Sequence, residues 1–167
     1  MLAEKTIEEI KVGIADWKVA REPVRIITLG LGSCVGIALW DPYEKMGGLA
    51  HIMLPDSRQF SNKSNPAKYA DLAIPDMLEE MVRKGARRNA ITAKIAGGAQ
   101  MFSFPDKTIS TLNIGQRNIE MTMNVLRSLN ISLKGRHTGE NYGRTMIFDP
   151  SNGDVYIRTI GKPLITI

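Results

Sequence analysis

The chain has 167 residues, of which 43% are hydrophobic and 23% charged, the balance of a soluble globular protein with one core. No apolar stretch approaches the roughly 20 residues of a membrane-spanning helix, and the acidic N-terminus lacks an apolar segment, so we expect no secretory signal. The net charge of +5 would suit nucleic acid, but the basic residues are scattered. Their densest cluster, residues 83–88, better suits the end of a helix, where cations are favoured.

Apolar and β-branched runs predict most elements of the first half of the chain. Residues 5–14 fit either a short helix or a first strand. Strands are predicted at 24–29, 34–40 and 49–54, with a turn at 41–45. The polar loop 55–66 suits a binding element and a mobile connector equally well. Helical spacing then runs from Ala67 to Gly85, with a kink or break expected at Pro75.

The second half of the chain adds one helix and several strands. A strand at 91–96 ends at Gly97 and Gly98, and a helix is predicted at 115–129. Further strands are predicted at 131–134, 144–149, 155–160 and 164–167. The seven or eight strands and two or three helices predict an α+β fold, a β-sandwich of two packed, mostly antiparallel or mixed sheets with helices on the outer faces. No linker or repeat divides the chain, so we expect a single domain over residues 1–167.

The chain's one cysteine, Cys34, directly follows a Gly-rich turn, and one of its two histidines, His51, lies seventeen residues later. If strands 34–40 and 48–54 form a hairpin, paired residue numbers sum to roughly 87, which places Cys34 opposite residues 51–53. The two side chains share a face only if their offset from direct opposition is even, and the sequence leaves that offset open. A thiol and an imidazole this close are the minimum parts of a cysteine nucleophile and its base.

Three further features fit a nucleophilic site. A neighbouring imidazolium and exposed turn amides would lower the pKa of the Cys34 thiol, and the N–H of Cys34 is a candidate oxyanion donor. Thr28, on the preceding strand, has a hydroxyl or carbonyl that would hold the other ring nitrogen of His51. Each residue alone also fits a plain structural role, with the cysteine as inert core and the threonine chosen for β propensity.

Metal and nucleotide sites are not favoured. One cysteine and two histidines, His51 and His137, are too few soft ligands for zinc, and His137 is expected on the surface. Gly30 and Gly32 are not followed by the third glycine of a dinucleotide fingerprint, because Val35 stands there. We therefore expect no cofactor.

The sequence closely resembles the CheD family of bacterial chemotaxis proteins, the chemoreceptor glutamine deamidases. The matching runs occur in family order and span nearly the whole chain: 28–35, 47–55, 68–71, 93–102, 114–118 and 141–144. The family often has a Gly-Gly pair where this chain has Gly139-Glu140. The resemblance implies a fold similar to the catalytic domain of cytotoxic necrotizing factor toxins.

The resemblance also implies roles for individual residues. Cys34 would be the nucleophile, His51 the general base and acid, and Thr28 the residue that orients the imidazole. The hypothetical reaction is attack on a glutamine carboxamide, loss of ammonia and hydrolysis of a thioester. The substrate-binding positions are predicted at Gly32, Ser33, Gly97 and Gly98. The roles of Lys68, Tyr69, Arg117 and Asn118 stay open.

The partners that the resemblance implies are proteins. The substrate would be the cytoplasmic helical region of methyl-accepting chemoreceptors, whose glutamines become glutamates during adaptation. A CheC-type phosphatase of the response regulator would be the regulatory partner, and the location would be the cytoplasm. Some esterase activity on a glutamate methyl ester would follow from the same chemistry. Two alternatives remain: a non-catalytic adaptor for a CheC-type phosphatase, and a basic nucleic-acid-binding module.

Overall fold

The computed structural model describes residues 6–61, 64–101 and 113–167. The N-terminal residues 1–5, the middle of the predicted loop 55–66 and residue 102 of the run 93–102 lie outside this part of the chain. The strands are β1 (Glu9–Val12), β2 (Asp16–Arg21), β3 (Arg25–Leu31), β4 (Val35–Asp41), β5 (Met46–Ile52), β6 (Thr92–Gly97), β7 (Ser132–Thr138), β8 (Arg144–Phe148), β9 (Val155–Arg158) and β10 (Ile165–Thr166). The helices are α1 (Ala70–Arg83) and α2 (Ile114–Ser128), with short 3-10 turns at Ser57–Gln59, Pro66–Lys68 and Arg88–Ala90.

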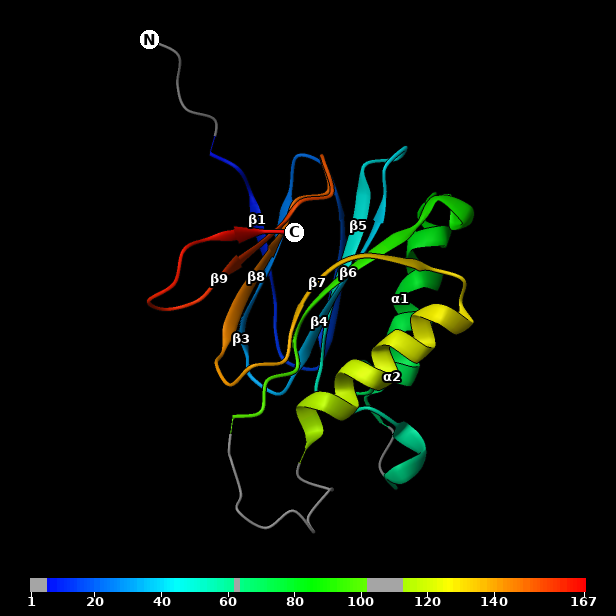
Figure 1. Cartoon of the computed structure of the whole chain (residues 1–167). Coiled ribbons are helices and arrows are strands. Elements are labelled where there is room, and N and C mark those ends of the chain that lie inside the picture. Colours follow the sequence, from blue (N-terminus) through cyan, green and yellow to red (C-terminus); the bar gives the residue numbers. More distant parts are fainter. Residues whose placement is uncertain (1–5, 62–63, 102–112) are drawn as a thin grey trace.

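In the part of the chain that the structure describes, ten strands form two sheets of five that pack face to face (Figure 1). The first sheet has the order β1-β3-β8-β9-β10 and the second the order β2-β5-β4-β6-β7. Between them lies an apolar core: Val12, Ile26, Leu31, Ala38, Leu49, Ala96, Met146, Phe148, Val155 and Ile157. The predicted α+β sandwich of mixed sheets is therefore correct. Two pairs are parallel, β1 with β3 and β6 with β7, and all the others are antiparallel.

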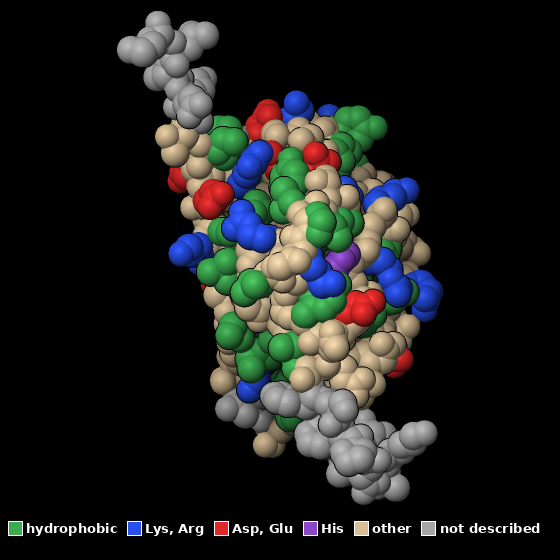
Figure 2. All heavy atoms as spheres, turned by 60° about the vertical axis from the view of Figure 1, so that its left-hand side comes forward, with side chains coloured by type: hydrophobic (Ala, Val, Ile, Leu, Met, Phe, Trp, Pro, Cys, Tyr) green, Lys and Arg blue, Asp and Glu red, His purple; other side chains and the backbone are tan. Residues whose placement is uncertain are grey.

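Both helices cover the same sheet, the second one (Figure 1). Each helix buries an apolar stripe against it, with Ile74, Met77 and Met81 of α1 fully buried. Helices on both outer faces were expected, and this was wrong, since no described helix covers the first sheet. Figure 2, which brings the side of that sheet forward, shows Lys and Arg side chains interspersed with hydrophobic ones rather than gathered in one basic patch.

Several predicted boundaries needed correction. The strand β2 was not predicted, although its apolar and polar residues alternate, and β5 begins at Met46, three residues before the predicted strand. Pro75 does not break α1, because one missing N–H removes a single backbone hydrogen bond while the buried stripe holds the helix on the sheet. Within the described residues, no helix is long and apolar enough to cross a membrane.

Candidate active site

The hairpin of β4 and β5 has the register that the sequence predicts. Val35 pairs with Ile52 and Gly36 with His51, so paired numbers sum to 87. Because directly paired residues project to the same face of a sheet, His51 shares its face with Gly36. Cys34 precedes Gly36 by two residues and packs against the core between the sheets, which is also the face that His51 occupies. The offset that the sequence left open is therefore even, and Cys34 and His51 lie on one face, with no hydrogen bond between the thiol and Nε2.

Residues 32–34, here called the cysteine loop, are held by hydrogen bonds to their backbone carbonyls. The N–H of Gly98 donates to the Cys34 carbonyl and that of Ala99 to the Gly32 carbonyl, both at 2.8 Å. The fully buried Asn118 of α2 donates its amide N–H groups to the carbonyls of Ser33 and Met53, each at 2.9 Å. One side chain thus ties the cysteine loop to the end of the strand that carries His51. The sequence signalled Asn118 only through its place at the start of a predicted helix.

Gly97 and Gly98 pack directly against this loop. Both are buried and have positive φ, +105° and +70°. A Cβ at Gly97 would overlap the Cys34 carbonyl oxygen, and one at Gly98 would overlap the Ile119 side chain. Contact of these two glycines with substrate stays a prediction.

Substitution of Gly97 by alanine is expected to lower the free energy of unfolding by at least ~2 kcal/mol, because the left-handed backbone and a backbone clash act together. The matched control is Gly161→Ala, since Gly161 has a φ of +76° with open space around its Cβ position. That control should lose only the conformational cost of ~1–2 kcal/mol. Chemical denaturation measures both, and equal losses would contradict the packing role of Gly97.

Within the described part of the chain, the amide N–H groups of Ser33 and Cys34 donate to no backbone carbonyl, and that of Cys34 interacts with its own thiol. Both residues are half-buried, and Met101 lies over Gly32, with its Cγ 3.3 Å from the position a Cβ would take there. Amides on an accessible turn beside a nucleophile are the donors that an oxyanion requires. The N–H groups of Ser33 and Cys34 are therefore both candidate donors.

Thr28 and His51 form a fully buried pair across the two sheets. The Thr28 hydroxyl donates to the Val12 carbonyl at 2.8 Å, and the same oxygen lies 2.7 Å from Nδ1 of His51. A hydroxyl has one proton, so with that proton on Val12 the threonine oxygen accepts from Nδ1–H. Nε2 then carries the lone pair, and it is buried without a hydrogen-bond partner. Thr28 thus sets the tautomer in which Nε2 is a base.

Burial sets the protonation states of the pair. It lowers the pKa of His51 to about 4, and it raises the pKa of the Cys34 thiol, an effect that a backbone hydrogen bond only partly offsets. The expected lowering of the thiol pKa was therefore wrong, because desolvation outweighs the turn amides and the neutral imidazole supplies no charge. At neutral pH the resting pair is a thiol beside a neutral base.

The structure also gives the surroundings of other residues that the sequence analysis singled out. The Arg117 guanidinium contacts the Gln59 side chain, and the carbonyl of Lys68 accepts from the N–H groups of Met53 and Leu54. His137 was expected on the surface but lies half-buried on β7, with Nδ1 inaccessible. Among the described residues, no group of three or more His, Cys, Asp or Glu side chains could hold a metal ion.

Comparison with known proteins places this arrangement in a family. A family model described as CheD chemotactic sensory transduction matches residues 53–159. A curated relative from Moorella thermoacetica, named probable chemoreceptor glutamine deamidase CheD, is 62% identical over 96% of both chains. The chain belongs to the CheD family.

Other CheD relatives are similarly close over nearly the full length. The relative from Desulforamulus reducens is 57% identical over 95% of both chains, and that from Clostridium botulinum strain Hall is 56% identical over 93% of this chain and 95% of its own. Both carry the same name as the Moorella protein. Among solved structures, Bacillus licheniformis hypothetical protein YfiH is similar with a TM-score of 0.45 and 16% identity, over 83% of this chain and 61% of that chain.

Proposed function

We propose that this protein deamidates glutamine side chains of methyl-accepting chemoreceptors to glutamate, in the cytoplasm, and so contributes to chemotactic adaptation. Membership in the CheD family and the printed names of its relatives support the substrate class. The observation that carries the chemistry is the buried Thr28–His51 hydrogen bond, which leaves Nε2 unprotonated on the face that Cys34 shares. A CheC-type phosphatase is the proposed regulatory partner.

The first half of the reaction forms a thioester. Because the thiol is protonated at rest, His51 Nε2 removes its proton as the sulfur attacks the glutamine carboxamide carbon. The N–H groups of Ser33 and Cys34 stabilise the resulting oxyanion. The tetrahedral intermediate collapses as the imidazolium returns its proton to the leaving nitrogen, so ammonia departs. Gly32, with Gly97 and Gly98 beneath it, keeps the loop backbone close to the bound side chain.

The second half restores the enzyme. Nε2 takes a proton from water, whose oxygen attacks the thioester carbon, and the thiolate leaves and is protonated by the imidazolium. The net change is glutamine plus water to glutamate plus ammonia. A glutamate methyl ester presents the same acyl carbon with methanol as the leaving group, so esterase activity is a second expected outcome of this site.

Incubation of the protein with a cytoplasmic chemoreceptor fragment tests this proposal. Ammonia release should match the mass gain at individual glutamines, measured by mass spectrometry of the digested fragment. The control is the same protein after alkylation, because Cys34 is the chain's only cysteine. Unchanged glutamines alongside tight binding of a CheC-type phosphatase would refute the deamidase and support the adaptor.

Substitution of Thr28 by valine is expected to lower kcat by about 10²–10³-fold, because the isosteric side chain no longer fixes the imidazole tautomer. Thr28→Ser keeps the hydroxyl and should retain most of the activity. Steady-state kinetics on the receptor fragment compares them. Equal losses in the two variants would indicate that packing at this position matters and the hydrogen bond does not.

A further inference from the structure

Asn118 is a polar residue on the buried face of α2. Its neighbours on this face, Ile119 and Leu126, are apolar, whereas the Asn118 amide is fully buried. Both of its N–H groups donate, to the carbonyls of Ser33 and Met53, but the amide oxygen has no hydrogen-bond partner among the described residues. An apolar side chain would avoid the cost of that unpaired oxygen. A polar group that a fold keeps at such a cost is expected where its donors have a further role.

The Ser33 carbonyl belongs to the same peptide group as the N–H of Cys34. This peptide is trans and planar, so its C=O and N–H point in opposite directions. Asn118 holds the carbonyl at 2.9 Å on the side of α2, and the N–H of Cys34 therefore points away from α2. That N–H interacts with the Cys34 thiol, so it lies on the side where a substrate carbonyl would meet the sulfur. Asn118 thus sets the direction of a candidate oxyanion donor from a distance.

The peptide groups on either side are held by backbone donors. The N–H of Ala99 donates to the Gly32 carbonyl and that of Gly98 to the Cys34 carbonyl, both at 2.8 Å. All three carbonyls of the cysteine loop thus have a donor, and for the middle carbonyl that donor is a side chain. A substitution of Asn118 can therefore change the direction of the Cys34 N–H while the two flanking bonds stay in place.

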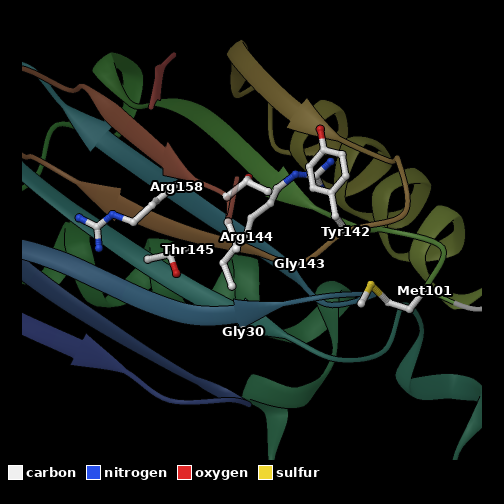
Figure 3. A pocket seen from close by; sticks show the side chains of 9 residues that line it. Gly30, Met101, Tyr142, Gly143, Arg144, Thr145 and Arg158 are labelled. Carbon is white, nitrogen blue, oxygen red and sulfur yellow. The ribbon is translucent and has the colours of Figure 1, made fainter. Parts of the chain in front are cut away.

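The side of the cysteine loop away from α2 is open. A hollow of about 490 Å³ lies there, and its lining includes Gly30 of β3, Met101 and residues of β8 and β9. Figure 3 shows the Met101 side chain near the end of the strand that carries Gly30. The helix α2 covers the second sheet, whereas β3, β8 and β9 belong to the first. Asn118 therefore contacts the loop from its packed side and leaves the open side to a substrate.

We propose that Asn118 is a positioning residue for the oxyanion hole: it holds the Ser33 carbonyl and so directs the Cys34 N–H at the oxygen of the tetrahedral intermediate. The inference rests on the proposed function, since it assigns a residue to the step in which the sulfur attacks the carboxamide. Donation to the carbonyl also polarises the peptide group, which makes its N–H a stronger donor. The second bond, to Met53, ties this peptide to the chain just after the strand of His51, so donor and base keep a fixed relation.

The test compares two reactions of one thiol, because Cys34 is the chain's only cysteine. p-Nitrophenyl acetate acylates the sulfur through a tetrahedral oxyanion, as the thiol proton passes to His51 and nitrophenolate leaves. Iodoacetamide alkylates the same sulfur by displacing iodide, and no oxyanion forms. Asn118→Leu, with an apolar side chain of similar size, should slow acylation about ten- to a hundredfold and change the alkylation rate less than about twofold. On the receptor fragment it should lower kcat and leave KM within about twofold.

The matched control is Thr122→Val, one turn further along the same buried face of α2. Thr122 is fully buried and its hydroxyl has no hydrogen-bond partner among the described residues, so valine keeps the shape and removes no bond. This control should leave both rates unchanged. Asn118→Ala leaves room for a bridging water and keeps the test valid if Asn118→Leu does not fold. It should slow acylation about tenfold, because a mobile water fixes the carbonyl less firmly.

Equal slowing of acylation and alkylation in a folded Asn118 variant would overturn the proposal, because the residue would then support the thiol or the fold in general. Unchanged acylation in such a variant would overturn it too, and so would a wild-type thiol that the ester does not acylate. The ester reaction needs no receptor, so its outcome is separate from that of the proposed function. If the wild-type protein shows the expected dependence on Asn118 but releases no ammonia from the fragment, the proposed function is wrong and the positioning role is supported.

Discussion

Replacing Cys34 with alanine is expected to reduce ammonia release from a receptor fragment to the uncatalysed background, because no other described residue on this face can form the acyl intermediate. Cys34→Ser should also be nearly inactive, since a buried hydroxyl beside a neutral imidazole is a far weaker nucleophile than the thiol. The measurement is single-turnover deamidation followed by mass spectrometry.

The fold should tolerate these changes. Cys34 is half-buried at the margin of the core between the sheets, and the carbonyl that anchors its loop belongs to the backbone. The free energy of unfolding of both variants should therefore lie within about 1 kcal/mol of the wild-type value. Retained turnover in a folded Cys34→Ala protein would contradict the role of the sulfur and leave the loop as structure only.

Replacing His51 with glutamine is expected to lower kcat by at least ~10³-fold, because both proton transfers lose their carrier. In the wild-type protein kcat/KM should fall as pH decreases through about 4, where the base becomes protonated, and it should be flat between about pH 5 and 8. A limb near neutral pH that disappears with the histidine would contradict the buried, neutral base.

The pH dependence of the free energy of unfolding is a second test of the buried, neutral His51. The pKa of His51 is about 4 in the folded protein, against 6.5 in an exposed histidine, so between these values the unfolded chain binds one more proton. Acidification through this range should therefore destabilise the wild-type protein by up to about 3 kcal/mol. The His51→Gln variant lacks this titrating group. Chemical denaturation should therefore show a smaller difference in the free energy of unfolding between pH 4.5 and pH 7 for His51→Gln than for the wild-type protein.

The sequence predicted the hairpin well because the turn between β4 and β5 is short, so strand ends and register follow from local residues. It named Thr28 as the partner of His51 but left open whether the hydroxyl or the carbonyl makes the contact, because that depends on how the two sheets pack; the structure has the hydroxyl oxygen 2.7 Å from Nδ1. The direction of the thiol pKa also needed the structure, because burial is a property of the assembled core.

Other misses have similar causes. The strand β2 was overlooked because half of its six residues are charged and it lies at a sheet edge, where both faces are partly exposed. The parallel pairing of β6 with β7 requires the long connection through α2, which local patterns do not define. The clamp by Asn118 becomes visible only when hydrogen-bond partners are assigned one by one.

Nitrogen-15 NMR of the His51 imidazole tests the central claim most directly. The account predicts a neutral ring at pH 7 with the proton on Nδ1 and the lone pair on Nε2, and protonation only near pH 4. A ring that carries its proton on Nε2, or one already cationic at pH 7, would contradict it.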